Sequence, residues 1–448
     1  MIYNERKNGN INTILRVYHE HKNQINVEKK LTKNSLRQSE VTFKGGLTED
    51  VHRWFTLTPS FAPNLVRNML NEMGATPTKV VLDPFTGKGT TIIECKRRGF
   101  ESVGVEVNPL LHWISKTSVN WDLDEAKLNQ LKNELIEKHT RLCNSYKNKN
   151  LNDTINQLCI DIPKIHRVDK WWNNDILKDL LIIKKTISDL ECEDTYKDVF
   201  NLALNSILVN VANVSLGRLQ LHFIDRKNEK IDVNHLFYEQ LTFLFTDLNK
   251  VKHNSNIKST VYLGDSTRIH NILKNKMIDF VVTSPPYPNR YSYVWNTRPN
   301  LYFFDFFQTP KEASTLDKAT IGGTWGTATS VLSKGIINPH DSNVEKCVAP
   351  ICEDIRKHDN LMANYVMNYF NQLYVHLISQ TKVLNMGAGC AYVVGNSRIK
   401  GIEVETDILL AKLFESLNYE ILKIDRVRKR HSGIKLHEAI VYARNMNT

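Results

Sequence analysis

The run Thr283-Ser284-Pro285-Pro286-Tyr287 places a hydroxyl, two rigid residues and an aromatic ring side by side. The Ser284 hydroxyl can accept a hydrogen bond from an exocyclic amine, and the carbonyl of Pro285 can accept a second, since the Pro-Pro pair ends any sheet ladder. Two acceptors draw the nitrogen lone pair out of conjugation and direct it at an electrophile. Tyr287 offers a face on which a flat ring can stack. We therefore predict that Ser284, Pro285, Pro286 and Tyr287 are catalytic; the alternative is a strand that ends in a Pro-Pro turn with an aromatic plug.

A glycine-rich turn, Asp83-Pro84-Phe85-Thr86-Gly87-Lys88-Gly89-Thr90, follows the apolar stretch 79–82. Gly87 and Gly89 permit positive φ and a close approach of a ligand to the backbone. Nucleotide phosphates are the common alternative ligand, but Lys88 lies between the glycines, so the GxxxxGK[ST] phosphate loop is absent. Glu106 ends the next apolar stretch, where an acidic residue can accept hydrogen bonds from ribose hydroxyls; a solvated strand end is the alternative.

These motifs resemble those of the DNA amino-methyltransferases that use S-adenosylmethionine. The catalytic tetrapeptide of that family is Asp, Asn or Ser followed by Pro-Pro-Tyr, and the Ser form is typical of its cytosine-N4 enzymes. The resemblance implies S-adenosylmethionine as cofactor, double-stranded DNA with a flipped base as substrate, and a cognate restriction endonuclease as a companion. It assigns the cofactor to Phe61, Asp83, Pro84, Phe85, Gly87, Gly89, Thr90, Glu106, Asp265 and Ser266.

Within this resemblance, Asp265 binds the amino group of adenosine, although an N-cap for the following helix is an equally good interpretation. The sulfonium is a strong electrophile, so alignment can supply much of the acceleration without a strong general base. A cytosine-C5 enzyme would need a nucleophilic cysteine, and none lies beside the tetrapeptide. An adenine-N6 enzyme, an RNA or protein amide methyltransferase and a DNA-binding specificity subunit with an inactive pocket remain open, and Ser284 is the main discriminator.

The elements that must position these residues alternate between strand and helix. Short apolar runs at 79–82, 102–107, 260–263 and 278–282 predict buried parallel strands. Helices are expected at 64–73, 91–98, 198–214, 361–383 and 405–417. The pattern predicts an α/β, mostly parallel, doubly wound sheet. The closing strands 420–426 and 437–442 resemble the reversed terminal strand of the Rossmann-like methyltransferase fold.

The chain divides by composition into a basic N-terminal arm (1–50), a catalytic domain (51–120 and 259–448) and a large helical insertion (121–258). The insertion comes before the Asp265 strand, which departs from the usual order of the family and leaves open which insert recognises the target. The insertion, the polar segment 309–357, expected to be a long loop, and the basic turn 428–433 are candidates for DNA contact. Residues 215–222 and the aromatic stretch 289–295 are further candidates.

Bulk properties agree with a polyanionic partner. The 448 residues carry a net charge of +11 and a pI of about 9.1. Residues 1–44 contain nine Lys or Arg and four Glu. The seven cysteines form no CxxC pair, so we expect reduced thiols and neither a disulfide framework nor a metal site. We see no signal peptide and no long apolar run, which predicts a cytoplasmic protein without a membrane partner.

Overall fold

The computed structural model describes residues 30–33, 36–216, 220–226, 228–274, 276–323, 330, 332–431 and 434–448. Most of the predicted N-terminal arm lies outside these residues. So do parts of three other predicted contact segments, at 217–219, 324–329 and 432–433. Among the described helices, none combines the length and apolar character that a membrane crossing requires.

An eight-stranded sheet forms the centre of the molecule, in the order β1-β11-β12-β8-β7-β2-β3-β6. The strands β6, β3, β2, β7 and β8 are parallel, whereas β12 is antiparallel to both of its neighbours, β8 and β11. Their bounds are Leu31–Lys33 (β1), Val80–Asp83 (β2), Glu101–Glu106 (β3), Ser259–Leu263 (β6), Ile278–Thr283 (β7), Leu384–Gly395 (β8), Tyr419–His431 (β11) and Ile434–Asn445 (β12). The predicted α/β sheet with a reversed terminal strand is confirmed.

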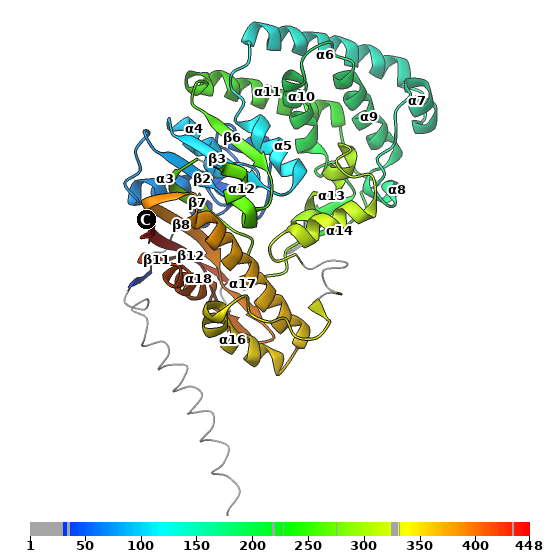
Figure 1. Cartoon of the computed structure of the whole chain (residues 1–448). Helices are drawn as coiled ribbons and strands as arrows, with labels where there is room; N and C mark the ends of the chain where they lie inside the picture. Colours follow the sequence, from blue (N-terminus) through cyan, green and yellow to red (C-terminus); the bar gives the residue numbers. More distant parts are fainter. Residues whose placement is uncertain are drawn as a thin grey trace, which may run out of the picture.

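Helices cover both faces of this sheet (Figure 1). Alternate residues of β7 show the two layers, because Val281 packs in the cluster that contains Phe370 of α17, whereas Val282 packs in the cluster that contains Leu65 of α3. The helices beside the sheet are α3 (Pro63–Glu72), α4 (Thr90–Arg97), α5 (Pro109–Ser118), α12 (Ile269–Leu273), α17 (Asn360–Thr381) and α18 (Thr406–Ser416).

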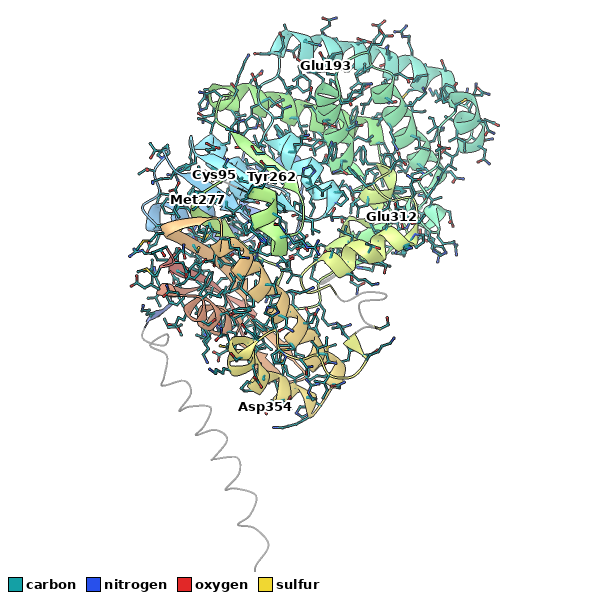
Figure 2. The ribbon with its side chains drawn as sticks, in the orientation of Figure 1. Cys95, Glu193, Tyr262, Met277, Glu312 and Asp354 are labelled. Atoms are coloured by element: carbon teal, nitrogen blue, oxygen red, sulfur yellow. The ribbon has the colours of Figure 1, made fainter. Side chains whose placement is uncertain are left out.

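A group of helices forms a second mass above the sheet in Figure 1. It contains α6 (Glu125–Tyr146), α7 (Leu151–Leu158), α8 (Val168–Trp171), α9 (Asn174–Ser188), α10 (Asp194–Ile207) and α11 (Val233–Val251). The small hairpin of β4 (Val214–Leu216) and β5 (Leu221–Phe223) follows α10, so the predicted helix 198–214 is wrong at its end. Figure 2 shows Glu193 in this group and Asp354 of α16 (Ser342–Arg356) at opposite ends of the part of the molecule that is described.

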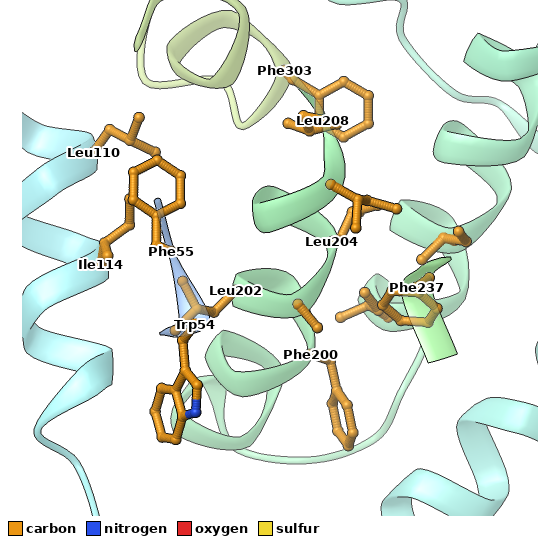
Figure 3. Close-up of a cluster of buried hydrophobic side chains, with 14 of the residues drawn as sticks. Trp54, Phe55, Leu110, Ile114, Phe200, Leu202, Leu204, Leu208, Phe237 and Phe303 are labelled. Atoms are coloured by element: carbon orange, nitrogen blue, oxygen red, sulfur yellow. The ribbon is translucent and has the colours of Figure 1, made fainter. Parts of the chain in front are cut away.

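The helical insertion shares one hydrophobic core with α5 and with the segment before α3. Trp54 and Phe55 pack in the same cluster as Ile114 of α5, Phe200 of α10 and Phe237 of α11 (Figure 3). The carboxylate of Asp247 in α11, which is fully buried, strengthens this junction. It accepts hydrogen bonds from the Val51 amide (2.9 Å), the Trp54 indole (2.9 Å) and Arg53 Nε (3.0 Å). The division into separate domains stays a prediction.

Two expectations about the C-terminal half are wrong. The predicted loop 309–357 contains two helices, α14 (Pro310–Ala319) and α16 (Ser342–Arg356). Thr309 and Glu312 form a capping box at the start of α14, and the Asp341 side chain caps α16, which explains why these polar segments are helical. The predicted basic turn 428–433 is strand as far as His431, because the pairing of β11 with β12 continues to that residue, with register shifts on the way.

Candidate active site

A pocket opens at the carboxyl ends of the central strands. The loops after β2, β3, β6 and β7 meet there because parallel strands end at the same edge of a sheet. Its lining comprises Pro84, Phe85, Gly87, Val105, Glu106, Val107, Asn108, Leu111, Gly264, Asp265, Ser266, Ser284, Pro286, Tyr293, Ala319, Thr320 and Ile321. The structure therefore brings eight predicted site residues to one cavity, namely Pro84, Phe85, Gly87, Glu106, Asp265, Ser266, Ser284 and Pro286.

The glycine-rich loop has the predicted backbone. Gly87 has φ +53° and Gly89 has φ +99°, conformations that residues with a Cβ rarely adopt. Lys88 between them is buried, and its ammonium group donates to the carbonyls of His52 (2.7 Å) and Phe55 (3.0 Å). Burial lowers the pKa of Lys88 to about 8. These contacts occupy the lysine in holding the loop against residues 52–55, so it does not act as a phosphate-binding lysine.

Glu106 joins the end of β3 to this loop. Its Oε2 accepts a 2.7 Å hydrogen bond from the Gly87 amide, and its Oε1 accepts one of 2.8 Å from the Asn108 amide. Burial raises the pKa of Glu106 to about 7, although these two N–H donors act in the opposite direction. The carboxyl group lines the pocket and keeps further lone pairs for a ligand.

Asp83 lies directly before the loop and is fully buried. Its Oδ1 accepts hydrogen bonds from Thr283 Oγ1 (2.6 Å) and from the Phe85 amide (3.1 Å). Its Oδ2 is buried and accepts no hydrogen bond of standard geometry within the described part of the chain, although the Thr91 side chain interacts with the carboxyl group. Burial raises the pKa of Asp83 to about 6. This buried carboxylate behind the loop, with Glu106 and Asp265 in the pocket lining, suits a cationic ligand such as S-adenosylmethionine, so the residues present fit that cofactor.

The tetrapeptide predicted to be catalytic begins where β7 ends. The Ser284 hydroxyl donates to the carbonyl of Val393 in β8 (3.1 Å). Its side chain is also hydrogen-bonded with that of Tyr287, and the hydroxyl oxygen keeps a lone pair as an acceptor. The Tyr369 hydroxyl donates to the Pro286 carbonyl (2.7 Å), and the Asn289 amide donates to the Tyr287 carbonyl (2.8 Å). The Pro285 carbonyl receives no hydrogen bond from any residue that the structure describes. Two acceptors, one side chain and one backbone, are thereby left in neighbouring residues.

The ring of Tyr287 packs against the backbone of β8. A Cβ built on Gly395 would lie 2.8 Å from two Tyr287 ring carbons, so only glycine permits this approach. The guanidinium of Arg430 lies 5.6 Å from the ring centroid, and its Nη1 donates to the Asn396 carbonyl (2.9 Å). Burial raises the pKa of the Tyr287 hydroxyl. The sequence analysis missed Gly395 and assigned Arg430 to a turn.

Asp265 and Ser266 form the side of the pocket that β6 contributes. The Asp265 carboxylate accepts a 2.8 Å hydrogen bond from the Thr267 amide, so the predicted N-cap is confirmed, while its contact with adenosine stays a prediction. The buried ring of His376 is held by the Ser266 carbonyl (3.1 Å) and the Tyr392 hydroxyl (2.7 Å). Burial lowers the pKa of His376 to about 4, so the ring is neutral at physiological pH.

Six predicted site residues do not line the pocket: Phe61, Asp83, Gly89, Thr90, Pro285 and Tyr287. Asp83, Pro285 and Tyr287 adjoin lining residues in the chain, and Gly89 and Thr90 follow the lining residue Gly87 by two and three positions. Phe61 packs in the core cluster with Leu65 and Val282. Its role at the cofactor therefore stays a prediction. Asn108 lines the pocket and was not predicted, whereas Tyr293, Ala319 and Thr320 belong to segments predicted only as candidates for DNA contact. The capping box at Thr309 was the sequence signal that could have predicted α14 as a helix.

Comparisons with known proteins agree with this geometry. Residues 2–117 match a family model described as DNA methylase, N6_N4_Mtase. The chain is 24% identical over 398 residues to the type II methyltransferase M.MvaI of Kocuria varians, covering 83% of this chain and 82% of that protein. It is 22% identical over 419 residues to M.AvaI of a Nostoc species and 21% identical over 429 residues to M.BsoBI of Geobacillus stearothermophilus. These alignments each cover 87% of this chain and 83% and 82% of the two relatives, respectively.

Among solved structures, the rRNA methyltransferase aviRa from Streptomyces viridochromogenes aligns with 92% of this chain and 96% of its own. The TM-score is 0.35 at 10% identity, which is too low to support a conclusion about function. The sequence comparisons and the pocket at the ends of β2, β3, β6 and β7 lead to the same result. The chain is a distant homologue of type II methyltransferases, and its N-terminal part matches the DNA methylase family.

Proposed function

We propose that this protein is a DNA methyltransferase that transfers a methyl group from S-adenosylmethionine to the exocyclic N4 amine of cytosine. The observation that carries the proposal is the pair of acceptors at the end of β7. The Ser284 hydroxyl donates its hydrogen bond to the Val393 carbonyl, and the Pro285 carbonyl accepts none from the described residues. An amine with two hydrogens matches two such acceptors.

The neighbouring loops supply a cofactor site of the required chemistry. S-adenosylmethionine, when bound, supplies an electrophilic methyl group. The Gly87 loop lets a ligand approach the backbone closely, and Glu106 offers oxygens to ribose hydroxyls. Asp83, buried directly behind the loop, adds a carboxylate that favours a cationic ligand. Asp265 is proposed to receive the amino group of adenosine. Phe61 is proposed to close the methionine end from α3.

The target base is proposed to leave the DNA duplex and stack on Tyr287. The Tyr287 ring is held in place by Gly395 on β8 and by Arg430 on β11, so little conformational entropy is lost when a base stacks on it. The Tyr369 hydroxyl fixes the Pro286 carbonyl, which holds the turn between the two acceptors and the ring. These residues orient the amine, and the proton released after methyl transfer can pass to water.

Ser284 favours cytosine N4 over adenine N6 as the methylated atom, because the Ser-Pro-Pro-Tyr sequence resembles the catalytic motif of cytosine-N4 enzymes. The similarity to type II methyltransferases supports a role as the modification component of a restriction-modification system, with a cognate endonuclease as companion. The helical insertion α6–α11 is proposed to contribute to DNA recognition.

The test is to incubate purified protein with unmethylated DNA and S-adenosylmethionine, digest the DNA and separate the nucleosides by mass. We expect N4-methylcytosine, and we expect Ser284→Ala to lower the rate on the order of 10²-fold through loss of one oriented hydrogen bond. Cofactor binding by Ser284→Ala should match the wild type. N6-methyladenine would keep the geometry and overturn the substrate, whereas 5-methylcytosine or unmodified DNA would overturn the proposal.

A further inference from the structure

A second pocket lies between α13 (Tyr293–Phe303) and α14, next to the candidate active site. Its lining comprises Ser292, Val294, Trp295, Arg298, Tyr302, Pro310, Ala313, Ser314 and Asp317. The same two helices supply Tyr293 and Ala319 to the first pocket. They lie between the sheet and the helical insertion in Figure 1, and Glu312, labelled in Figure 2, marks α14. A ligand in this second pocket would therefore lie near the substrate.

Arg298 is the group in this pocket that lacks a full set of partners. Its guanidinium carbon lies 4.8 Å from the centroid of the Trp295 ring and 6.0 Å from that of Tyr302. The Tyr302 hydroxyl accepts a hydrogen bond from the guanidinium. Nε of Arg298 is nevertheless buried without an acceptor within the described part of the chain, and no described carboxylate forms a salt bridge with this arginine. A buried N–H without an acceptor is unfavourable, so an incoming ligand with acceptors would gain this interaction.

The surroundings of Arg298 favour a base over a phosphate. Val294, Pro310 and Ala313 make part of the lining apolar, which suits the edge or face of a base better than a hydrated phosphate. The Asp317 carboxylate, which accepts a 3.0 Å hydrogen bond from the Ser292 hydroxyl, also lines the pocket and would repel a phosphate. In the major groove, guanine alone presents two adjacent acceptors, O6 and N7, to the forked donors of an arginine.

We infer that the pocket between α13 and α14 recognises a guanine of the DNA target, with Arg298 donating to O6 and N7. The inference rests on the proposed function and adds a determinant of sequence specificity to it. Arg298 lies on α13, which begins only a few residues after the tetrapeptide. This short connection would hold the guanine at a fixed distance from the methylated base. Arg298 would thus help to determine which sequence is methylated.

The experiment maps methylated positions in a plasmid library with randomised sequences. It compares the wild type with Arg298→Lys, which keeps the charge and loses the fork, and with Arg298→Met. Arg444→Met is the control, because Arg444 lies at the C-terminal end of β12, which runs antiparallel to β8 and therefore ends on the side of the sheet opposite the site. We expect one guanine in the wild-type motif to become replaceable in both Arg298 variants, with a loss of discrimination of roughly 10- to 100-fold, while the control keeps the motif.

A second measurement uses the wild-type protein and does not depend on the folding of a variant. A synthetic duplex carries 7-deazaguanine, which lacks N7, at each guanine of the motif in turn. We expect kcat/KM to fall roughly 10-fold at one position for the wild type, and not for Arg298→Met if that variant folds. Three results would overturn the inference: no effect of 7-deazaguanine at any position, an unchanged motif in folded Arg298 variants, or a uniform loss over all sequences with a reduced salt dependence, which indicates a phosphate contact. A wild type that methylates no DNA would instead overturn the proposed function.

Discussion

The Thr283 hydroxyl donates a 2.6 Å hydrogen bond to Oδ1 of Asp83, although the two residues lie 200 positions apart in the chain. Thr283 ends the strand that carries the tetrapeptide, and Asp83 ends the strand that carries the glycine-rich loop. Both residues are buried. This bond therefore fixes the substrate side of the candidate site to the cofactor side.

Replacing Thr283 by the isosteric valine tests this connection. Thr283→Val should lower the free energy of unfolding by about 1–3 kcal/mol, because a buried carboxylate loses a donor. It should also weaken S-adenosylmethionine binding by displacing Asp83. Urea unfolding and calorimetry measure the two effects. Thr260→Val, in the edge strand β6, is the matched control and should change stability by less than about 0.5 kcal/mol. Equal stability of both variants would show that the hydrogen bond contributes nothing measurable.

Glu106 should make folding stability depend on pH. Burial raises its pKa from the ordinary 4.5 to about 7, so between these values the folded state holds a proton that the unfolded state has released. The stabilisation is thus fully present below about pH 4.5 and is lost as the pH rises through about 7, by about 1.4 kcal/mol for each unit of pKa difference. Glu106→Gln should abolish this part of the pH dependence in unfolding measurements, and Glu125→Gln, at an exposed position, should not.

Binding of S-adenosylmethionine should show the opposite trend with pH. Ribose hydroxyls donate to the ionised carboxylate, so affinity should rise between about pH 6 and 8 as Glu106 loses its proton. Calorimetric titration at several pH values measures this slope. Glu106→Gln should bind more weakly, by about 1–3 kcal/mol, and with a flatter pH profile. An identical slope for the variant and the wild type would assign the pH dependence to another group.

Gly395 should control the position of the Tyr287 ring. In Gly395→Ala the added methyl group would lie 2.8 Å from two ring carbons, so Tyr287 must move, at a cost of about 1–3 kcal/mol in stability and with a loss of methylation rate. The control is a double-mutant cycle with Tyr287→Ala, measured by unfolding. In the background without the ring, Gly395→Ala should cost much less, and additive effects would contradict the packing relationship.

Asp247 should hold the helical insertion to the segment before α3. Asp247→Asn removes the negative charge that pairs with Arg53 and weakens acceptance from the Val51 amide and the Trp54 indole. We expect a loss of about 3 kcal/mol, at the low end for broken buried ion pairs, because 21% of the Arg53 side chain is exposed. Thermal and urea unfolding measure it. Asp50→Asn, which removes a partly exposed partner of the same arginine, should cost about 1 kcal/mol or less.

The sequence by itself determined the features that depend on residues adjacent in the chain, such as strands, turns and helix caps. The apolar run before Thr283, the turn with Gly87 and Gly89, and Glu106 at the end of β3 were predicted from local patterns, and the structure contains them as strand, turn and strand end. The physical reason is that periodicity and backbone freedom act over a few residues. Caps are local as well, and the capping box of Thr309 and Glu312 was present in the sequence even though the polar composition around it led to the wrong prediction of a loop.

The tertiary structure decided which residues from distant parts of the chain contact one another. Neither the packing of Tyr287 on Gly395 nor the approach of Arg430 to the same ring follows from sequence, because these contacts join residues more than 100 positions apart through the register of three strands. The pairing of β11 with β12 made Arg430 a strand residue beside the Tyr287 ring, where composition alone suggested a solvated turn. Phe61 shows the converse, since its motif predicted a cofactor contact and its burial in the core with Val282 follows from how α3 packs on the sheet. Local chemistry thus named the groups of the candidate site, and the packing of strands and helices determined which of them share it.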